Sequence, residues 1–216
     1  LNDLTITHGL PEPEIQFTTT TSAGAESVTS VNLQLNASFG PSGNSTVQYA
    51  VTGGTATGGG TDYTLASGTA TILSGATTTN INIAVVNDLV DEIDETIQVT
   101  ISSPSNATLG TNTSHTYTIQ DNDTRGVTVT QSGGTTLVTE GGATDSYTIV
   151  LTSQPTATVT ITLSPDSQVT TSPTPSLAFT TGNWATPQTV TVTAVNDDVA
   201  EGSHAGVITH SAAGGD

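Results

Sequence analysis

Apolar and polar residues alternate with a period of two along most of the chain, as in Val31, Leu33 and Leu35. In a β-strand such a run places its apolar side chains on one face. Later runs of the same kind are Ile81–Val85, Ile97–Ile101, Tyr117–Ile119, Val127–Val129, Tyr147–Leu151, Val159–Leu163 and Val190–Val192. Turn signals separate the runs at Gly40-Pro41, Gly53 to Gly60, Ser74-Gly75 and Pro104-Ser105-Asn106. Because no stretch of helix length has a 3.6-residue period, we predict an all-β fold of antiparallel sandwiches.

The pattern restarts after Asp123, and a short string recurs in each half. Ala84-Val85-Val86-Asn87-Asp88 resembles Ala194-Val195-Asn196-Asp197-Asp198, and each string leads from an alternating run into acidic residues. We therefore predict two tandem domains, a first repeat at 12–123 and a second repeat at 124–216. The join between them is too short to be a flexible linker. Residues 1–11 would be a leader or the tail of a preceding unit.

The second repeat is shorter than the first at its C-terminal end. In the first repeat 28 residues follow Glu95, whereas only 12 follow the equivalent His204 in the second. This difference predicts that the second sandwich lacks its last strand. Either the sequence is cut from a longer array, or a neighbouring chain supplies the strand.

The charge of the chain excludes several classes of function. Its formal net charge is −18, with 19 acidic residues, no Lys, and Arg125 as the one basic residue. One cation cannot neutralise several phosphates, which excludes nucleic acid as a partner. The absence of Lys and Cys removes P-loop, Schiff-base, disulfide and thiolate chemistry. No apolar run approaches the ~18 residues of a membrane span.

The acidic residues cluster, and the cluster indicates a metal. Five of the eleven carboxylates in residues 12–123 lie between Asp88 and Glu95, and Asp121 and Asp123 flank Asn122. Like charges at this density repel one another unless salt water or a bound hard cation neutralises them. Ca²⁺ takes six to eight oxygen ligands in flexible geometry, whereas Mg²⁺ demands tighter octahedral geometry. Zinc and copper favour His or Cys, and neither occurs in this cluster.

Five separated motifs in the first repeat resemble the Calx-β domain, a family found in sodium–calcium exchangers and in large bacterial surface proteins. The motifs occur in the right order: Asp62-Tyr63-Thr64, Gly68–Ile72, Val86–Thr96, Asn106–Gly110 and Thr118–Asp123. The resemblance covers nearly all of the first repeat. It implies a seven-stranded immunoglobulin-like sandwich with Ca²⁺ bound at one tip.

The resemblance also implies a set of calcium ligands in the first repeat. The residues at matching positions are Asp62, Asn87, Asp88, Val90 (through its backbone carbonyl), Glu92, Glu95, Asp121, Asn122 and Asp123. The family usually has a Glu near the end of its first strand, where this chain has Gly24. Either Glu26 substitutes for that Glu or one ligand is lost. Since Asn87 and Asn122 replace carboxylates, we expect weaker binding or fewer ions than in the intracellular sensors.

The second repeat is a more distant match to the family. Glu140 fits the first-strand glutamate, and the acidic stretch is matched by Asn196, Asp197, Val199 and Glu201. His204 replaces the last glutamate, there is no Asp-Tyr motif, and the terminal acidic triplet would fall beyond residue 216. Whether this repeat has a complete site stays open.

The alternatives to a calcium site are less specific. The acidic cluster could be a solvated face of a salt-adapted protein, although such a face would be acidic throughout. Trp184 is interpreted as a packing residue at a turn, with a sugar-stacking platform as the sharper alternative. The four histidines indicate no catalytic set, and no Ser has a nucleophile-elbow context, so we predict no enzymatic activity.

We therefore predict a calcium-binding structural or adhesive repeat of a large, secreted or cell-surface bacterial protein, with Ca²⁺ stiffening the domain tip and the join between repeats. Its partners would be calcium ions and neighbouring repeats or other copies of the chain. The first alternative is a filament or matrix subunit that assembles by strand addition. The second is a carbohydrate-binding accessory module that contacts a surface glycan.

Overall fold

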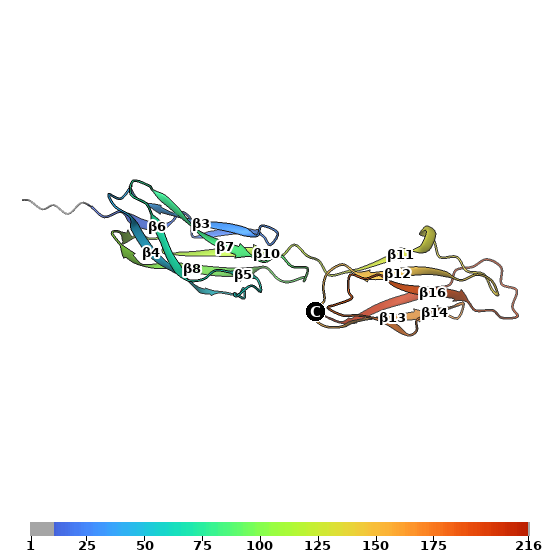
Figure 1. The fold of residues 1–216 in the computed structure, drawn as a ribbon. Coiled ribbons are helices and arrows are strands. Elements are labelled where there is room, and N and C mark those ends of the chain that lie inside the picture. The colour runs from blue at the N-terminus through green and yellow to red at the C-terminus, as the bar shows by residue number, and fades with distance from the viewer. Residues whose placement is uncertain (1–10, 216) are drawn as a thin grey trace, which may run out of the picture. The chain divides into compact units, whose positions relative to one another are not determined.

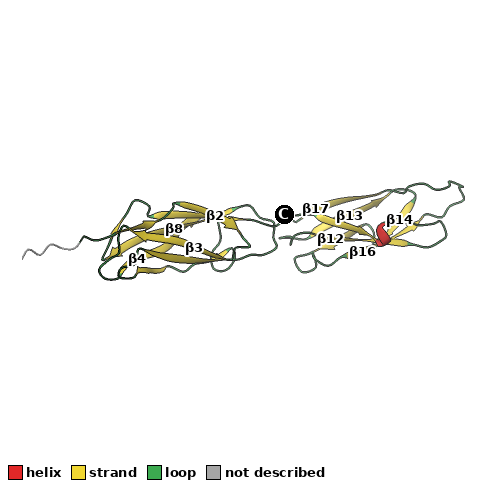
Figure 2. Cartoon of the chain, turned by 90° about the horizontal axis from the view of Figure 1, so that it is seen from above, coloured by secondary structure: helices red, strands yellow, loops and turns green. Residues whose placement is uncertain are grey.

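The structure, a computed structural model, describes residues 11–215, so the expected leader lies almost wholly outside the described residues. Within that range the chain forms β-strands and one 3₁₀ turn, Ser132–Gly134, without an α-helix (Figure 2), which confirms the all-β prediction. None of the described residues forms a helix able to cross a membrane. The described residues form two compact units, 11–88 with 93–122 and 89–92 with 123–215. The domain limits given above at 12 and 124 stay a prediction.

The first repeat is a sandwich of two five-stranded sheets, ordered β5-β7-β3-β1-β9 and β2-β10-β8-β4-β6 (Figure 1). Its strands are β1 (Glu14–Phe17), β2 (Thr21–Ala25), β3 (Ser30–Ala37), β4 (Ser45–Gly54), β5 (Tyr63–Thr64), β6 (Gly68–Ile72), β7 (Thr78–Val85), β8 (Glu95–Ser105), β9 (Thr108–Leu109) and β10 (Ser114–Gln120). The resemblance implied seven strands. The count is larger because β1–β2 and β5–β6 each cross from one sheet to the other, and β9 adds a two-residue edge.

The alternating runs of the first repeat form one hydrophobic core. Leu33 and Leu35 of β3, Ile81 and Ile83 of β7, and Ile97 of β8 are at most 1 % exposed, which confirms the predicted faces. The turn expected at Pro104-Ser105-Asn106 begins only at Asn106. The turn signal at Pro104 lies inside β8, which continues to Ser105 past a register shift against β4.

The second repeat has fewer strands, in sheets ordered β11-β12-β16-β14 and β15-β13-β17. They are β11 (Val127–Gln131), β12 (Asp145–Leu151), β13 (Val159–Pro165), β14 (Val169–Ser172), β15 (Ser176–Phe179), β16 (Gln188–Ala194) and β17 (Ile208–Gly214). Ile149, Ile161, Phe179 and Val190 form the centre of a separate core. Trp184 packs against it from the turn after β15, as predicted.

Strands β11 and β17 lie at open edges of the second sandwich. Among the described residues β17 pairs with β13 alone, whereas β8 of the first repeat lies between β4 and β10. Six of the seven residues of β17 are exposed. Val127 and Val129 lie in a strand, β11, as the alternation predicts, but they are 44 % and 48 % exposed. The physical reason is that none of the described strands of this repeat takes the place of β10.

Candidate calcium site

Three carboxylates from three separate segments meet at the end of the first sandwich. Glu26 follows β2, Asp88 follows β7 and Asp123 follows β10, and one carboxylate oxygen of each lies within 4.8 Å of the others. Glu26 is only 6 % exposed. Its Oε1 accepts a hydrogen bond of 2.8 Å from the Asp88 backbone N–H. A buried carboxylate beside two others is costly unless opposite charge neutralises it.

The strand β10 holds Glu26 in this position. β2 runs parallel to β10, with Ala25 opposite Gln120, and the Glu26 N–H donates to the Gln120 carbonyl at 2.8 Å. Gly24 permits the close approach, because a Cβ there would lie 2.4 Å from the Tyr117 hydroxyl oxygen. From the sequence, either Glu26 substitutes for the glutamate that the family has near Gly24, or one ligand is lost. The structure places the Glu26 carboxylate beside Asp88. Its role as a ligand stays a prediction.

A second group is formed by Asp62, Glu92 and Glu95, whose carboxylate oxygens also lie within 4.8 Å of one another. Asp62 directly precedes β5, and Glu95 is the first residue of β8. The backbone of Asp62 is fixed on both sides, since its carbonyl accepts the Val86 N–H at 2.9 Å and its N–H donates to the Thr57 carbonyl at 3.0 Å. The Asp62 carboxylate also accepts the Thr57 N–H.

The other expected ligands of the first repeat lie outside these two groups. Asn87 is exposed, and its amide donates to the Asp88 carbonyl at 3.3 Å. Asn122 is exposed and accepts the Ser27 N–H at 3.2 Å, which fixes the turn after Glu26. Asp121 and Val90 are partly buried. The hydrogen bonds of Asn87 and Asn122 fix the acidic loops, and direct contact of these four residues with an ion stays a prediction.

The sequence reasoning missed two roles within the acidic cluster. The Arg125 guanidinium forms an ion pair of 2.7 Å with Asp91, inside the second compact unit. The Asp94 carboxylate accepts the Asp121 backbone N–H at 3.2 Å. The loop conformation decides both contacts, and alternation of apolar residues carries no information on it.

The donor set of the two groups fits a hard cation. Six carboxylates gather in two groups, and the whole chain contains one Lys or Arg residue to offset them. Every donor in both groups is an oxygen, the ligand type that Ca²⁺ prefers, and neither group contains the nitrogen or sulfur ligands of zinc. Glu26, Asp88 and Asp123, or Asp62, Glu92 and Glu95, would hold the ion, which would supply positive charge rather than reaction chemistry.

The expected ligands of the second repeat are not gathered in the same way. Glu140, Asn196, Asp197, Val199 and Glu201 are all exposed. Glu140, Val199 and Glu201 line one cavity of about 490 Å³. Within residues 124–215, no three His or carboxylate side chains have ligand atoms within 4.8 Å of one another. Glu201 instead lies 3.3 Å from the His204 ring.

Two other aspartates of the second repeat fix loops rather than join a ligand group. The Asp145 carboxylate accepts the backbone N–H groups of Leu137 and Ser146, and these bonds hold its pKa below the ordinary 3.8. Asp166 accepts the N–H groups of Val207 and Gln168, which likewise lower its pKa. Carboxylates with lowered pKa values stabilise these loops in the charged form.

The fold defines a tandem of immunoglobulin-like β-sandwiches, and the first of them has an end rich in carboxylate oxygens. The family model of the Calx-beta domain matches residues 11–123 and 138–209, and the chain belongs to this family. No curated protein matches the chain.

Several solved structures resemble the chain. The apo-form Calx CBD1 domain is 24 % identical over 52 % of this chain and 100 % of that one, with a TM-score of 0.48. The calcium binding domain CBD12 of CALX1.1 is 19 % identical over 85 % and 76 %, with a TM-score of 0.49. The Calx CBD2 domain is 20 % identical over 50 % and 88 %, with a TM-score of 0.46.

Proposed function

We propose that the chain is a calcium-binding structural repeat, with the ion bound at the tip of the first repeat. The observation that carries the proposal is the pair of three-carboxylate groups in a chain with one Lys or Arg residue. Without an ion, the carboxylates repel one another and strain the loops after β2, β7 and β10. A bound Ca²⁺ joins these loops, so that the tip becomes stiffer and the first repeat more stable.

The proposed setting is a large, secreted or cell-surface bacterial protein in which such repeats act as spacers or adhesive modules. Asn87 and Asn122 stand where carboxylates would bind more tightly, which favours a weak site. Extracellular calcium modules bind with Kd values of about 10⁻⁴–10⁻³ M. Such a site is filled in millimolar calcium and empty at the lower concentrations inside cells.

A structural role is also supported by the chain's buried histidine. The His115 ring lies 2.8 Å from the Ser22 hydroxyl and 2.7 Å from the Thr19 carbonyl, an arrangement that resembles a nucleophile with its base. His115 is however 3 % exposed and packs against the Phe17 ring, 5.5 Å between centroids. A substrate could not reach it, so we assign this contact to the joining of β10 with the adjacent segment 19–22.

The proposal is tested by thermal unfolding of the chain in low salt, with calcium and with chelator. We expect calcium to raise the unfolding temperature of the first repeat by several degrees. Magnesium at the same concentration controls for simple charge screening and should have the smaller effect. Identical unfolding curves under all three conditions would reject the proposed function.

A second candidate function, assembly by strand addition, is favoured by the open edge at β17. An edge strand presents backbone N–H and C=O groups that another strand can pair with. In this function the chain is a subunit of a filament or matrix. Size-exclusion chromatography with light scattering tests it: assembly predicts a mass that grows with protein concentration, whereas a constant monomer mass would contradict it.

A further inference from the structure

The sequence offers one peptide bond to proteases of the trypsin class. These enzymes bind a basic side chain in a specificity pocket with a carboxylate at its base, and they cut the bond that follows this side chain. Arg125 is the one Lys or Arg among the 216 residues, so the bond that fits is Arg125–Gly126. It lies in residues 121–126, which form no strand between β10 and β11. Exposed segments of this kind are preferred sites of proteolysis.

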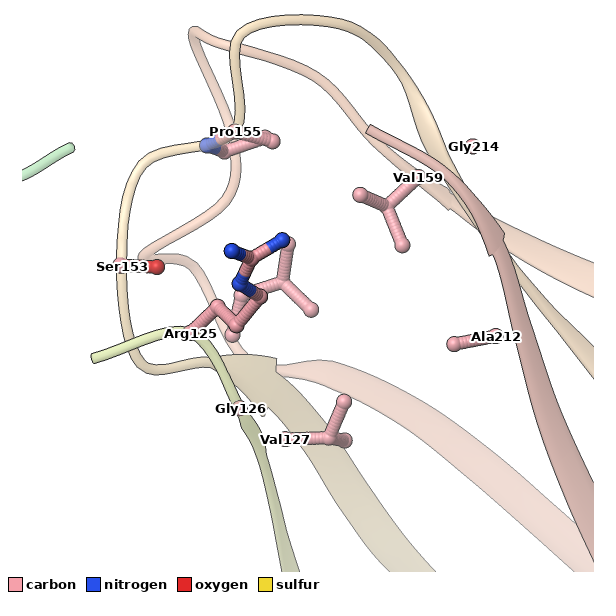
Figure 3. A pocket seen from close by; sticks show the side chains of 9 residues that line it. Arg125, Gly126, Val127, Ser153, Pro155, Val159, Ala212 and Gly214 are labelled. Carbon is pink, nitrogen blue, oxygen red and sulfur yellow. The ribbon is translucent and has the colours of Figure 1, made fainter. Parts of the chain in front are cut away.

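The Arg125 side chain is accessible, and its guanidinium is nevertheless held in place. The side chain is 64 % exposed. Figure 3 shows it extending toward the loop that contains Ser153 and Pro155. The guanidinium Nε donates to the Asp91 carboxylate at 2.7 Å. Asp91 therefore binds the same group that a protease must take into its pocket, and it binds that group with the same chemistry, a carboxylate.

Thr152 holds the backbone on both sides of this bond. Its Oγ1 donates to the Thr124 carbonyl at 2.7 Å, and its N–H donates to the Gly126 carbonyl at 3.0 Å. A Cβ on residue 126 would lie 2.9 Å from Thr152 Oγ1, so the glycine permits this close approach. A protease pairs with the backbone next to the bond it cuts. Both hydrogen bonds must therefore open before cleavage, and the rate follows the population of the open form.

The loop that carries Asp91 also carries expected calcium ligands. Asp88 lies three residues before Asp91 and Glu92 directly after it, and each belongs to one of the three-carboxylate groups. The Leu89 carbonyl of the same loop accepts the Gln154 N–H at 2.6 Å. An ion bound by Asp88 or Glu92 would thus fix the backbone on either side of Asp91, and with it the carboxylate that holds the guanidinium.

We propose that the Arg125–Gly126 bond is a processing site for a trypsin-like protease, and that loss of calcium opens it. Water adds across the amide, which leaves a carboxylate on Arg125 and an amine on Gly126 and separates the two repeats. Asp91 and Thr152 slow the cut because they hold the side chain and the backbone of the site. The calcium step rests on the proposed function, whereas protection by these two residues does not.

The experiment follows trypsin cleavage of the whole chain, with about 10 mM calcium or with chelator, by gel densitometry and intact-mass spectrometry. Each rate is divided by the rate for a small arginine substrate in the same buffer, which removes any effect of calcium on the protease itself. We expect two products, 1–125 and 126–216, and cleavage about tenfold faster with chelator. Tenfold corresponds to a site with a Kd of about 10⁻³ M that is filled only in the closed form.

Two variants test the protection, each with a matched control. Asp91→Asn keeps the size of the side chain and removes its charge, so cleavage in calcium should become about two- to fivefold faster, the range for exposed ion pairs. Asp198→Asn changes an exposed aspartate of the second repeat and should leave the rate unchanged. Thr152→Val removes the hydroxyl donor and should speed cleavage with and without calcium. Thr130→Val, on exposed β11, is its control.

Fluorescence of Trp184 shows whether each variant keeps the unfolding temperature of the second repeat, so that faster cleavage is not mistaken for loss of the fold. Cleavage of Asp91→Asn at the parent rate would reject protection by the ion pair. An uncut chain in the parent and in both variants would reject the processing site.

The calcium step fails separately from the proposed function. Equal cleavage rates with calcium and with chelator, in a chain whose unfolding temperature calcium raises, would reject the calcium step and leave the proposed function standing. If calcium changes neither the cleavage rate nor the unfolding temperature, the proposed function fails as well, and the variants alone decide the protection of the bond.

Discussion

The two repeats start from the same alternating pattern, and among the described residues the difference with the largest consequence is the strand β10 of the first. This strand affects both how completely the core is covered and how the carboxylates are grouped. In the first repeat β10 covers the core and its end carries Asp123 to Glu26 and Asp88. In the second repeat none of the described strands takes this place, the apolar residues of β11 are half exposed, and the acidic residues stay apart. A single strand therefore contributes to the core with its side chains and to the site with the residues that follow it.

The two repeats also differ in what limits their stability. The first repeat has a closed core and crowded carboxylates, so electrostatic repulsion opposes its folded state in addition to the loss of conformational entropy that every domain pays. The second has dispersed charge and an open core, so its folded state is limited by the apolar surface that it buries. Calcium should therefore act on the first repeat, and an added strand on the second.

The largest expected effect comes from removing the contribution of β10 to the core. Tyr117→Ala should lower the free energy of unfolding of the first repeat by about 3–5 kcal/mol, as for other buried aromatic truncations. The matched change Val129→Ala on the open β11 should cost less than about 1 kcal/mol. Urea unfolding followed by circular dichroism measures the first. Fluorescence of Trp184, the one tryptophan, follows the second repeat. Similar costs at the two positions would show that β10 does not close the core.

Calcium should produce the next largest effect, confined to the first repeat. At 10 mM calcium and a Kd of about 10⁻⁴–10⁻³ M, binding stabilises the folded state by about 1.4–2.7 kcal/mol. The circular dichroism transition of the first repeat should move to higher temperature, while the Trp184 transition stays in place. A Trp184 transition that moves as far would remove the distinction between the repeats.

The effect of Glu26→Gln on the stability of the first repeat should change sign when calcium is added. The substitution removes a buried charge and keeps an acceptor for the Asp88 N–H. Without calcium the variant should be more stable than the parent chain by about 1 kcal/mol, and with calcium it should be less stable. Glu140→Gln is the exposed counterpart and should change neither value. A destabilised Glu26→Gln under both conditions would indicate that the carboxylate is neutralised within the protein.

The smallest expected effect is a pH dependence of the second repeat. Partial desolvation of the His210 ring lowers the pKa of its imidazole below the ordinary value of 6.5, and its Nε2 lies 2.7 Å from the Tyr147 hydroxyl. The unfolded chain therefore takes up the proton first, so stability is lost as pH falls from about 6.5 toward the folded pKa. His210→Gln should flatten this part of the Trp184 unfolding profile between pH 7 and 5. A slope that survives the substitution would assign the proton to another group.

The sequence predicted the parts of the fold that depend on side-chain alternation. The faces of β3, β7, β8, β12 and β16 follow from which residues are apolar, because burial selects one face of a strand. The exposure of Val127 and Val129 did not follow, because it depends on which strand lies next to β11. Pro104 was expected in a turn, but a register shift against β4 accommodates it within β8, and the sequence of one strand does not reveal such a shift.

The candidate site could be predicted only in part. The motif order indicated which loops carry the ligands, and the structure brings six of the expected residues of the first repeat into two groups. The sequence could not decide between Glu26 and a lost ligand, because the answer depends on the parallel pairing of β2 with β10. The pairing of Arg125 with Asp91 depends on loop conformation, which has no simple residue pattern.

The most direct test is a calorimetric titration of calcium into the parent chain and two matched double variants. One variant, Asp88→Asn with Glu92→Gln, removes a carboxylate from each group of the first repeat. The other, Asp197→Asn with Glu201→Gln, removes two exposed carboxylates of the second. We predict that the first variant loses the binding heat and that the second binds like the parent chain. Equal loss in both variants, or no binding heat in the parent chain, would contradict a calcium site built by β10 in the first repeat.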